Sequence, residues 1–490
     1  MLIEDKTLLP NGEMLDWSTK IKQVLPGWRL PDGHATTDVD IVDLLAMRSG
    51  MPGHDDSYGR LEPADMIANL RNLRKSTELR QVFQYNNMHY VALTHLFPTL
   101  INTSFAEYVD RRIFRPLSLG AMYNGTEAVL SGRRTDGWYR TGINATRCAE
   151  RWTGMGKLDE ACLGIPKSFG WWVDGDALFN AGPGGVVMSG LDMVKWMTEL
   201  LEPRVLSLDL LRRAEAPLSV MQPDNPYPEI STNLYGMSQM IYSYRSHQVI
   251  SHTGGQPGQY SVLIRVPRMG IALMIATNDE VFGPGMFRTV ANLVLDELLG
   301  LTPIDWEDRF LGQSLRSPRT FPRPSRDTQP PPLQERIAGT YSASGYGDIT
   351  LRPIAISDLG SDRILAPLRE ILALEPSNAT IFVAELKKVF ASHLILTPFE
   401  GREFNWTTAF IKPLLNEYGE TGEYGLGDVR VGSAVFERQG RGFGMFGNFW
   451  GAGIMAKASA VDLENIEGSS EVWFEKIQGH LESQQRLWKP

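Results

Sequence analysis

Three apolar segments joined by short glycine- and proline-containing turns constrain the fold of this chain most. They span residues 247–253, 259–266 and 271–277. Such short turns join neighbouring strands that run in opposite directions, so the pattern predicts an antiparallel meander. The third segment is apolar on both faces, which predicts a central place in its sheet rather than an edge.

The segments around this meander are predicted to be mainly helical. Apolar residues three and four apart, with capping residues at several starts, predict helices at residues 38–47, 64–73, 88–100 and 104–114, and another after Ser189. A helix from Met286 to Leu299 is expected to bury Val290, Leu293, Val294 and Leu298. Residues 124–182 have no clear period, which is typical of a lid or a site wall. Together these elements predict an α+β fold, an antiparallel sheet with an α subdomain.

The composition changes at residues 306–333, where prolines and arginines predict a stiff, solvated linker. Short strands with glycine-rich turns follow and predict a small all-β C-terminal domain, a barrel or a sandwich. We therefore expect three parts: residues 1–305, the linker 306–333, and residues 334–490. The predicted C-terminal strands are residues 339–342, 348–353, 381–386, 394–397, 434–437, 446–450 and 471–477.

Length and charge exclude several classes of protein. A chain of 490 residues exceeds one ordinary core, and a net charge of -9 argues against a nucleic-acid partner. No apolar run reaches the roughly 20 residues of a membrane span, and the N-terminus has no signal-peptide pattern, so a cytoplasmic protein is expected. Cys148 and Cys162 are predicted to be free thiols. No metal-binding motif occurs, and no metal or cofactor is expected.

Two short motifs are candidates for a functional site. Tyr85-Asn86-Asn87 stands at the start of the predicted helix 88–100, and His252-Thr253-Gly254-Gly255 ends the first strand of the meander. Glycines leave the backbone bare, so a ligand can approach and accept its N–H groups. Each motif also has a plain structural interpretation, as a hairpin corner or as a core tyrosine beside a helix cap. The local pattern leaves both interpretations open.

The motifs, in this order along the chain, resemble those of the serine β-lactamase and penicillin-binding-protein superfamily. Leu44–Pro52 is similar to its helix-to-loop element, Tyr85-Asn86-Asn87 to Tyr-x-Asn, and His252-Thr253-Gly254 to Lys/His-Thr-Gly. Ala181–Gly185 and the helix after it add to the resemblance, which covers about residues 1–300. It implies an antiparallel sheet flanked by an all-α subdomain, with the site between them. The C-terminal part resembles the barrel appended to some esterases and peptidases.

The resemblance also implies a chemistry and a set of roles. In this family a serine, activated by the lysine of Ser-x-x-Lys, attacks an ester or amide carbonyl and forms an acyl-enzyme. Tyr85 then takes the role of proton relay, and Asn87 contacts the substrate amide. Thr253 and Gly254 bind the polar end of the substrate. The backbone N–H of Gly255 supplies one half of the oxyanion hole.

His252 stands where the family more often has lysine. Because histidine is only partly charged at pH 7, strong recognition of a substrate carboxylate is not expected. The implied substrates are therefore small-molecule esters, amides or D-amino peptides rather than β-lactams. Some family members transfer the acyl group to an alcohol, so an acyltransferase of secondary metabolism is an alternative. The two-part layout is similar to that of filamentous-fungal metabolic hydrolases.

The tryptophans of the irregular segment are candidates for an acyl-binding wall. Trp138, Trp152, Trp171 and Trp172 fall within residues 124–182. A place in the subdomain core explains them equally well.

One family feature is missing from the sequence. No serine has lysine three residues later. The resemblance places that motif, with the first two strands, ahead of residues 2–6, so we expect a domain truncated at its N-terminal part. Strand 271–277 would then lose a neighbour and become an exposed edge. Tyr85 would lack the cation that makes a phenol a useful base. The chain is then either an incomplete form of an active hydrolase or a ligand-binding pseudoenzyme.

Overall fold

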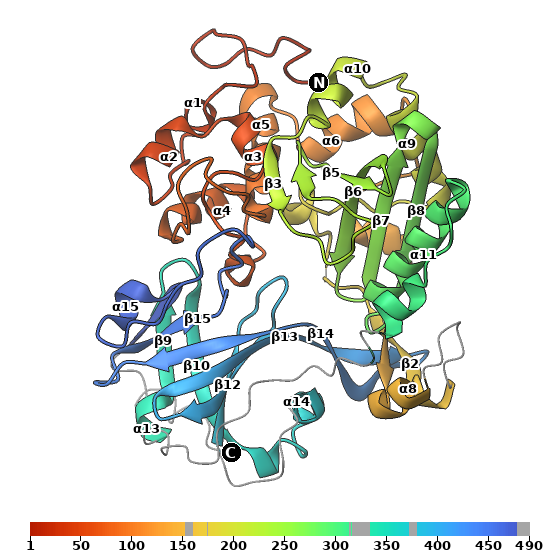
Figure 1. The fold of residues 1–490 in the computed structure, drawn as a ribbon. Helices are drawn as coiled ribbons and strands as arrows, with labels where there is room; N and C mark the ends of the chain where they lie inside the picture. The colour runs from red at the N-terminus through yellow and green to blue at the C-terminus, as the bar shows by residue number, and fades with distance from the viewer. Residues whose placement is uncertain (152–159, 174, 313–314, 316–333, 372–379, 478–490) are drawn as a thin grey trace.

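Two antiparallel sheets organise the computed structural model of the chain (Figure 1). The structure describes residues 1–490 except for 152–159, 174, 313–314, 316–333, 372–379 and 478–490. The first sheet has six strands and is drawn in green, beside the helices of the N-terminal part. The second has ten strands, and β9 to β16 of it form the C-terminal barrel. The expected α+β fold with an all-β C-terminal domain is confirmed.

The six-stranded sheet is a meander in chain order; its last three strands are the predicted ones, and the prediction missed β3, β4 and β5. The segment 247–253 forms the start of β6, which runs on to Gln256, and the other two predicted strands have the predicted bounds. Each strand pairs antiparallel with the next. The six strands are β3 (Ser219–Gln222), β4 (Asn233–Tyr235), β5 (Met240–Tyr244), β6 (His247–Gln256), β7 (Gln259–Val266) and β8 (Ile271–Thr277).

Strand β8 lies at the edge of this sheet, so the prediction of a central place is wrong. It pairs with β7, and no other strand of the described residues pairs with its far side. Helices α9 (Gly190–Leu201) and α11 (Gly283–Leu298) both contact β8, and most of its side chains are half-buried. Its apolar residues are therefore explained by helix packing rather than by flanking strands. An exposed edge is what the resemblance implied for a domain without its first strands.

Helix α11 buries a different face from the one predicted. Phe287, Ala291 and Leu295, four residues apart, are 1–4% exposed and pack in the core under the sheet. Val290 and Leu293 are 38% and 42% exposed, and Leu298 is also exposed. The helix carries two apolar stripes, and the sequence pattern alone does not say which one meets the sheet. The buried stripe is the one with the phenylalanine ring.

The N-terminal part is helical, and its longest helix agrees with the prediction. Helix α5 spans Asn87–Ile101 and is capped by Asn86, whose side chain accepts a hydrogen bond from the His89 N–H. The predicted helix 64–73 ends as a 3₁₀ turn, and the predicted helix 104–114 continues as a π turn from Asp110. The other helices of this part are α1 (Ile21–Val24), α2 (Gly33–Asp38), α3 (Ile41–Leu45), α4 (Pro63–Asn69) and α6 (Phe105–Val109).

The irregular segment 124–182 contains a β-hairpin that joins the two domains. Strands β1 (Gly137–Thr141) and β2 (Ile165–Gly170) pair with each other, and Ser168 of β2 pairs with Leu415 of the barrel. The hairpin thus extends the barrel sheet with residues from the first domain. The remaining helices of the first domain are α7 (Gly125–Leu130), α8 (Ala145–Arg151) and α10 (Leu208–Ala214).

Cys148 and Cys162 form a disulfide bond, so the prediction of free thiols is wrong. Both side chains are fully buried and pack against Phe282 and Leu315. The prediction rested on the low cysteine content of the chain, which carries no information about whether two thiols meet in space.

The C-terminal barrel closes because β13 pairs with both β12 and β14. The prediction missed β13 and most of β14, and residues 447–450 lie beyond the end of β15. The short helices are α13 (Gln334–Ile337), α14 (Ala366–Ile371) and α15 (Ile466–Ser469). The strands are β9 (Gly339–Ala343), β10 (Gly347–Ala355), β11 (Thr380–Glu385), β12 (His393–Glu400), β13 (Glu403–Asn416), β14 (Gly419–Phe436), β15 (Gly442–Phe446) and β16 (Val472–Lys476).

The first residues of the predicted linker pack on the first domain. Trp306 is fully buried in the core under the sheet, and the π turn Asp308–Gly312 contacts α11. Most of the predicted linker, 313–314 and 316–333, lies outside the described residues. None of the helices in the part that the structure describes has the length and hydropathy of a membrane-spanning helix.

Candidate functional site

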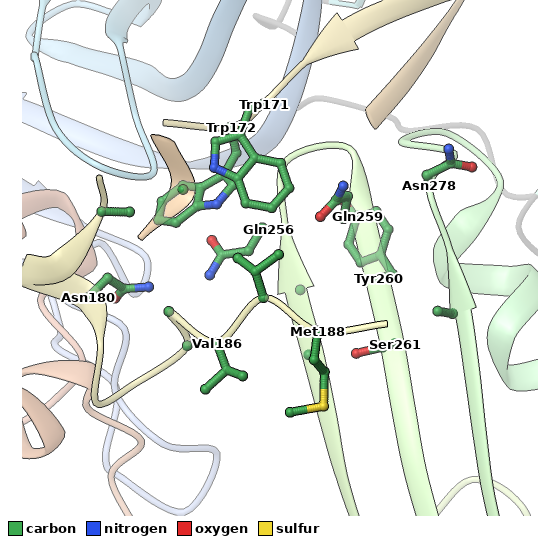
Figure 2. A pocket seen from close by; sticks show the side chains of 18 of the residues that line it. Trp171, Trp172, Asn180, Val186, Met188, Gln256, Gln259, Tyr260, Ser261 and Asn278 are labelled. Atoms are coloured by element: carbon green, nitrogen blue, oxygen red, sulfur yellow. The ribbon is translucent and has the colours of Figure 1, made fainter. Parts of the chain in front are cut away.

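All six candidate residues line one cavity of about 1070 Å³. Its walls come from the start of α5, from strands β6 to β8, from the loop ahead of α9 and from the barrel. Figure 2 labels the loop residues Val186 and Met188 and the strand residues Tyr260 and Ser261 among those that line this cavity. The predicted residues that the structure brings together here are Tyr85, Asn87, His252, Thr253, Gly254 and Gly255.

The helix cap at Asn86 places Tyr85 and Asn87 at the cavity. Asn86 is fully buried, and its side-chain amide donates to the Pro52 carbonyl at 2.6 Å while its oxygen caps α5. The residues on either side of it both line the cavity. Asn87 Nδ2 donates to Asp55 Oδ1 at 3.2 Å. The middle residue of Tyr-x-Asn is thus an anchor, and the outer two face the site.

The phenol of Tyr85 is not activated as a base in this structure. Burial, and then the nearby Asp55 carboxylate, raise the pKa of Tyr85 to about 12. No lysine is among the described residues that line the cavity. Both causes stabilise the protonated phenol, which agrees with the expectation that its cationic neighbour is missing.

His252 is held as a neutral side chain on the opposite wall. Its Nε2 lies 3.3 Å from Tyr235 Oη and its Nδ1 lies 2.7 Å from the Thr253 carbonyl. Burial lowers the pKa of His252 below its usual value. The ring centroids of Tyr85 and His252 are 6.5 Å apart. This wall therefore supplies hydrogen-bonding groups but little positive charge at neutral pH.

Gly254 and Gly255 leave the backbone of β6 bare at the cavity. A Cβ atom on Gly254 would lie 2.6 Å from Ser261 Oγ, and one on Gly255 would lie 3.4 Å from the Tyr260 ring. Both glycines are exposed, as is Thr253. A larger residue at position 254 would force Ser261 to move, so the sequence Gly-Gly here preserves the shape of this wall.

Two of the four candidate tryptophans line the cavity. Trp171 and Trp172 follow β2 and lie side by side in the wall (Figure 2). Trp138 is 39% exposed and does not line the cavity. Trp152 lies outside the described residues. The structure thus supports the wall for one pair and not for Trp138.

The barrel contributes to the cavity, which the sequence did not indicate. Phe390 and Asp428 line it together with residues of the first domain. Asp428 sits in a β-bulge, where two residues of β14 face one of β13, with φ at +43°. Glu280 accepts the Asp428 backbone N–H and fixes this bulge against the sheet. No local pattern marks Asp428, because only the paired strands define a bulge.

Asp55 is a second residue that sequence analysis missed. It is half-buried beside Asn87, and burial raises the pKa of its carboxyl. Its neighbour Asp56 forms an ion pair with Arg430 of the barrel. In the described residues, no three His, Cys, Asp or Glu side chains are grouped so that they could hold a metal ion.

A comparison with family models identifies the first domain. The model described as Beta-lactamase matches residues 8–295, more than half of the chain. The chain belongs to the β-lactamase family. The resemblance drawn from the three motifs is thereby confirmed at the level of the family.

Curated relatives of this β-lactamase family member are distant. The unguisins hydrolase ungD of Aspergillus violaceofuscus is 22% identical over 389 residues, which cover 72% of this chain and 64% of that protein. Penicillin-binding protein 4 of Amycolatopsis lactamdurans is 25% identical over 350 residues, covering 69% and 80%. The chain thus spans less than two thirds of the length of the Aspergillus hydrolase.

Two of the solved structures that match this chain are of low identity and have TM-scores below 0.5. The octameric penicillin-binding protein homologue of Pyrococcus abyssi matches 86% of this chain and 79% of its own, with a TM-score of 0.47 and 16% identity. The D-amino acid amidase of Ochrobactrum anthropi matches 58% and 77%, with a TM-score of 0.42 and 19% identity.

Proposed function

We propose that this chain is the substrate-binding part of a serine hydrolase that cleaves amide or ester bonds through an acyl-enzyme. The observation that carries the proposal is the meeting of Tyr85, Asn87 and the stretch His252–Gly255 in one cavity. The nucleophile is proposed to come from a segment outside the given sequence, because none of its serines begins Ser-x-x-Lys. The family match and the hydrolase among the relatives support the reaction class.

The roles follow from the positions of the groups. Asn87 offers its amide to a substrate amide, and the bare backbone of Gly255 offers an N–H to the developing oxyanion. Tyr85 would relay the proton once a cation stands beside it. An opposite charge within about 4–6 Å lowers a pKa by about 1–3 units, which would move the phenol towards its working range. Neutral His252 disfavours a substrate that needs a carboxylate anchor.

A ligand-binding protein without catalytic activity is the second candidate. The absence of Ser-x-x-Lys and the raised pKa of Tyr85 favour it. Acyl transfer to an alcohol is a variant of the first candidate, and competition between water and an added alcohol for the acyl group distinguishes the two.

A fluorophosphonate probe, which labels activated serines, tests these proposals. We expect no labelling of the chain as given. We expect labelling, and turnover of short acyl esters and aminoacyl amides, when the segment encoded directly upstream is restored. The matched control replaces the serine of the restored Ser-x-x-Lys by alanine. Tyr85→Phe in the restored chain is expected to lower kcat by about 10²–10⁴.

Two outcomes would contradict the proposal. A labelled serine in the chain as given would place the nucleophile within the sequence. An upstream region that encodes no Ser-x-x-Lys would leave the ligand-binding protein as the function.

A further inference from the structure

The sequence contains Asn-x-Ser/Thr triplets, the acceptor motif of N-linked glycosylation. Such a triplet receives a sugar only in a chain that enters the compartment where oligosaccharides are attached, and otherwise it has no such meaning. The structure bears on both questions, the compartment and the accessibility of each asparagine. The triplets begin at Asn102, Asn124, Asn144, Asn378 and Asn405.

The disulfide bond between Cys148 and Cys162 indicates an oxidising compartment. Both side chains are 0% exposed and pack with Phe282 and Leu315, so the bond is part of a buried cluster and not an exposed, labile link. Thiols in the cytosol are kept reduced, whereas disulfides persist in secreted proteins and in the compartments through which those proteins pass. The bond therefore argues against the cytoplasmic location that the sequence led us to expect.

Among the described triplets, Asn102 is the asparagine best placed to carry a sugar. It ends helix α5 in the left-handed region, with φ at +48°, and the chain turns there towards α6. Its backbone N–H donates to the Pro98 carbonyl at 3.2 Å, so the turn is held by the main chain. The residue is exposed, and its side chain has no hydrogen-bond partner among the described residues. Its Nδ2 can thus carry a bulky group at the surface.

The other triplets are less suitable. Asn405 is half-buried in the central barrel strand β13, and Thr407 of the same triplet is 1% exposed. The side-chain oxygens of Asn124 and Asn144 accept backbone N–H groups of α7 and α8, which holds each amide against the start of a helix. Asn378 lies outside the described residues. Asn102 is therefore the triplet asparagine that combines exposure with a side chain free of the fold.

We propose that Asn102 is an N-glycosylation site, in a chain that folds in an oxidising secretory compartment. In the transfer, Asn102 Nδ2 loses a proton and forms a bond to C1 of an oligosaccharide. The bond from C1 to a polyprenyl pyrophosphate carrier breaks, and the carrier leaves with its pyrophosphate; nothing is oxidised or reduced. Asn102 does not line the cavity, so a sugar there leaves the candidate site open. This modification site is independent of the proposed hydrolase function.

The test uses the full-length protein isolated from its own cells in the presence of N-ethylmaleimide, which blocks free thiols. Peptide N-glycosidase F, applied in heavy-oxygen water, converts each glycosylated asparagine into labelled aspartate. Mass spectrometry of the peptides then reads the sites and the state of the cysteines. We expect the label at Asn102, and Cys148 and Cys162 joined to each other without N-ethylmaleimide.

Variants expressed in the same cells assign the sugar to this triplet. Asn102→Gln and Ser104→Ala should each remove one glycan, seen as a faster-migrating band. Ser104 also caps α6, since its side chain accepts the Glu107 N–H at 3.1 Å. Ser104→Thr keeps both the cap and the triplet and should restore the glycan. Thr103→Ala changes the middle residue, keeps the triplet and is the matched control, which should carry the glycan as the wild type does.

Three results would overturn the inference. An unlabelled Asn102 in protein whose disulfide is formed would remove the site. Cysteines that carry N-ethylmaleimide would place the chain in a reducing compartment. A label at Asn405 without one at Asn102 would show that the exposure seen in the folded chain does not select the acceptor.

Discussion

The open sheet of the first domain and the closed barrel of the C-terminal domain differ in how the backbone groups of their strands are paired. In the barrel every strand has a partner on both sides, because β13 pairs with β12 and β14. In the open sheet β8 has a partner on one side only, among the described residues. Backbone groups at a sheet edge are unpaired, so the open sheet depends on what covers it. The barrel therefore has no open edge, whereas the sheet that carries part of the candidate site has one at β8 in the described residues.

The two regions also differ in what they give to the cavity. The open sheet presents the bare backbone of Gly254 and Gly255, and the barrel presents the bulge at Asp428. Glu280 joins them, because it accepts hydrogen bonds from the Gly258 N–H, the Tyr260 hydroxyl and the Asp428 backbone. The barrel thus forms part of one wall of a cavity that is otherwise lined mainly by the first domain.

The largest effect is expected from a cavity in the closed region. Trp406 is 1% exposed, and its indole N–H donates to the Phe446 carbonyl at 2.7 Å, past Gly432 of the intervening strand β14. Trp406→Ala should lower the free energy of unfolding by about 3–5 kcal/mol. Urea unfolding measures it, with the half-exposed Trp138→Ala as control, expected at about 1 kcal/mol or less. Similar losses in both variants would mean that the barrel core is no more tightly packed than the surface hairpin.

The next prediction tests which face of α11 supports the open sheet. Leu295 is 1% exposed and Leu293 is 42% exposed. Leu295→Ala should cost about 2–5 kcal/mol of unfolding free energy, and Leu293→Ala less than about 1 kcal/mol. Thermal and urea unfolding of both variants give the comparison. A larger loss for Leu293 would restore the face predicted from the sequence.

These two regions were also predictable to different degrees. The last three strands of the meander were found with accurate bounds because they are apolar and their turns are short, whereas β3, β4 and β5 were missed. In the barrel, β13 and most of β14 were missed because Pro413 and the five glycines of β14 give the composition of a loop. Packing requires at least one of these glycines: a Cβ on Gly432 would lie 2.6 Å from the Trp406 ring. Gly432, whose residue type is typical of a loop, is thus the residue that lets the Trp406 ring of β13 pack closely on β14.

The residues of the candidate site were also predictable from the sequence to different degrees. Tyr85, Asn87 and His252–Gly255 lie within short motifs, so their types and spacing were visible in the sequence. Asp428 lies in strand β14 of the barrel, and Arg134 lies in the irregular segment just ahead of β1; both line the cavity. The disulfide between Cys148 and Cys162 is of the same kind. Contacts that arise from packing between distant segments leave no local pattern to detect.

A smaller effect is expected from the contact between the two regions, which should make the free energy of unfolding depend on pH. Burial raises the pKa of Glu280 from its usual 4.5 to about 7, and Asp428 adds to the shift. The folded chain therefore holds this proton at pH values where the unfolded chain has lost it. The stabilisation is present below about pH 4.5 and is lost as the pH rises through about 7.

The variant Glu280→Gln removes the titration and keeps one acceptor oxygen, whereas its amide nitrogen cannot accept a backbone N–H at any pH. From pH 5 to pH 8 the wild type should lose on the order of 1–3 kcal/mol of stability relative to this variant. Urea unfolding across that range measures the difference. A constant difference between the two proteins would show that Glu280 does not titrate on unfolding.

The smallest effect on stability is expected near the open edge of the sheet. There, substitutions should change the self-association of the protein rather than its free energy of unfolding. Val290 and Leu293 project from α11, the helix that packs on β8, and both are exposed. Exposed apolar groups near an unpaired strand favour contact between molecules.

The double variant Val290→Lys, Leu293→Lys should change the free energy of unfolding by less than about 0.5 kcal/mol per site. It should also lower concentration-dependent self-association in sedimentation velocity, whereas Leu130→Lys, at an exposed site on α7, should not. Equal self-association of the wild type, the double variant and Leu130→Lys would mean that the open edge is protected in solution. The open sheet and the closed barrel would then differ in the hydrogen bonding of their strands but not in how their surfaces associate.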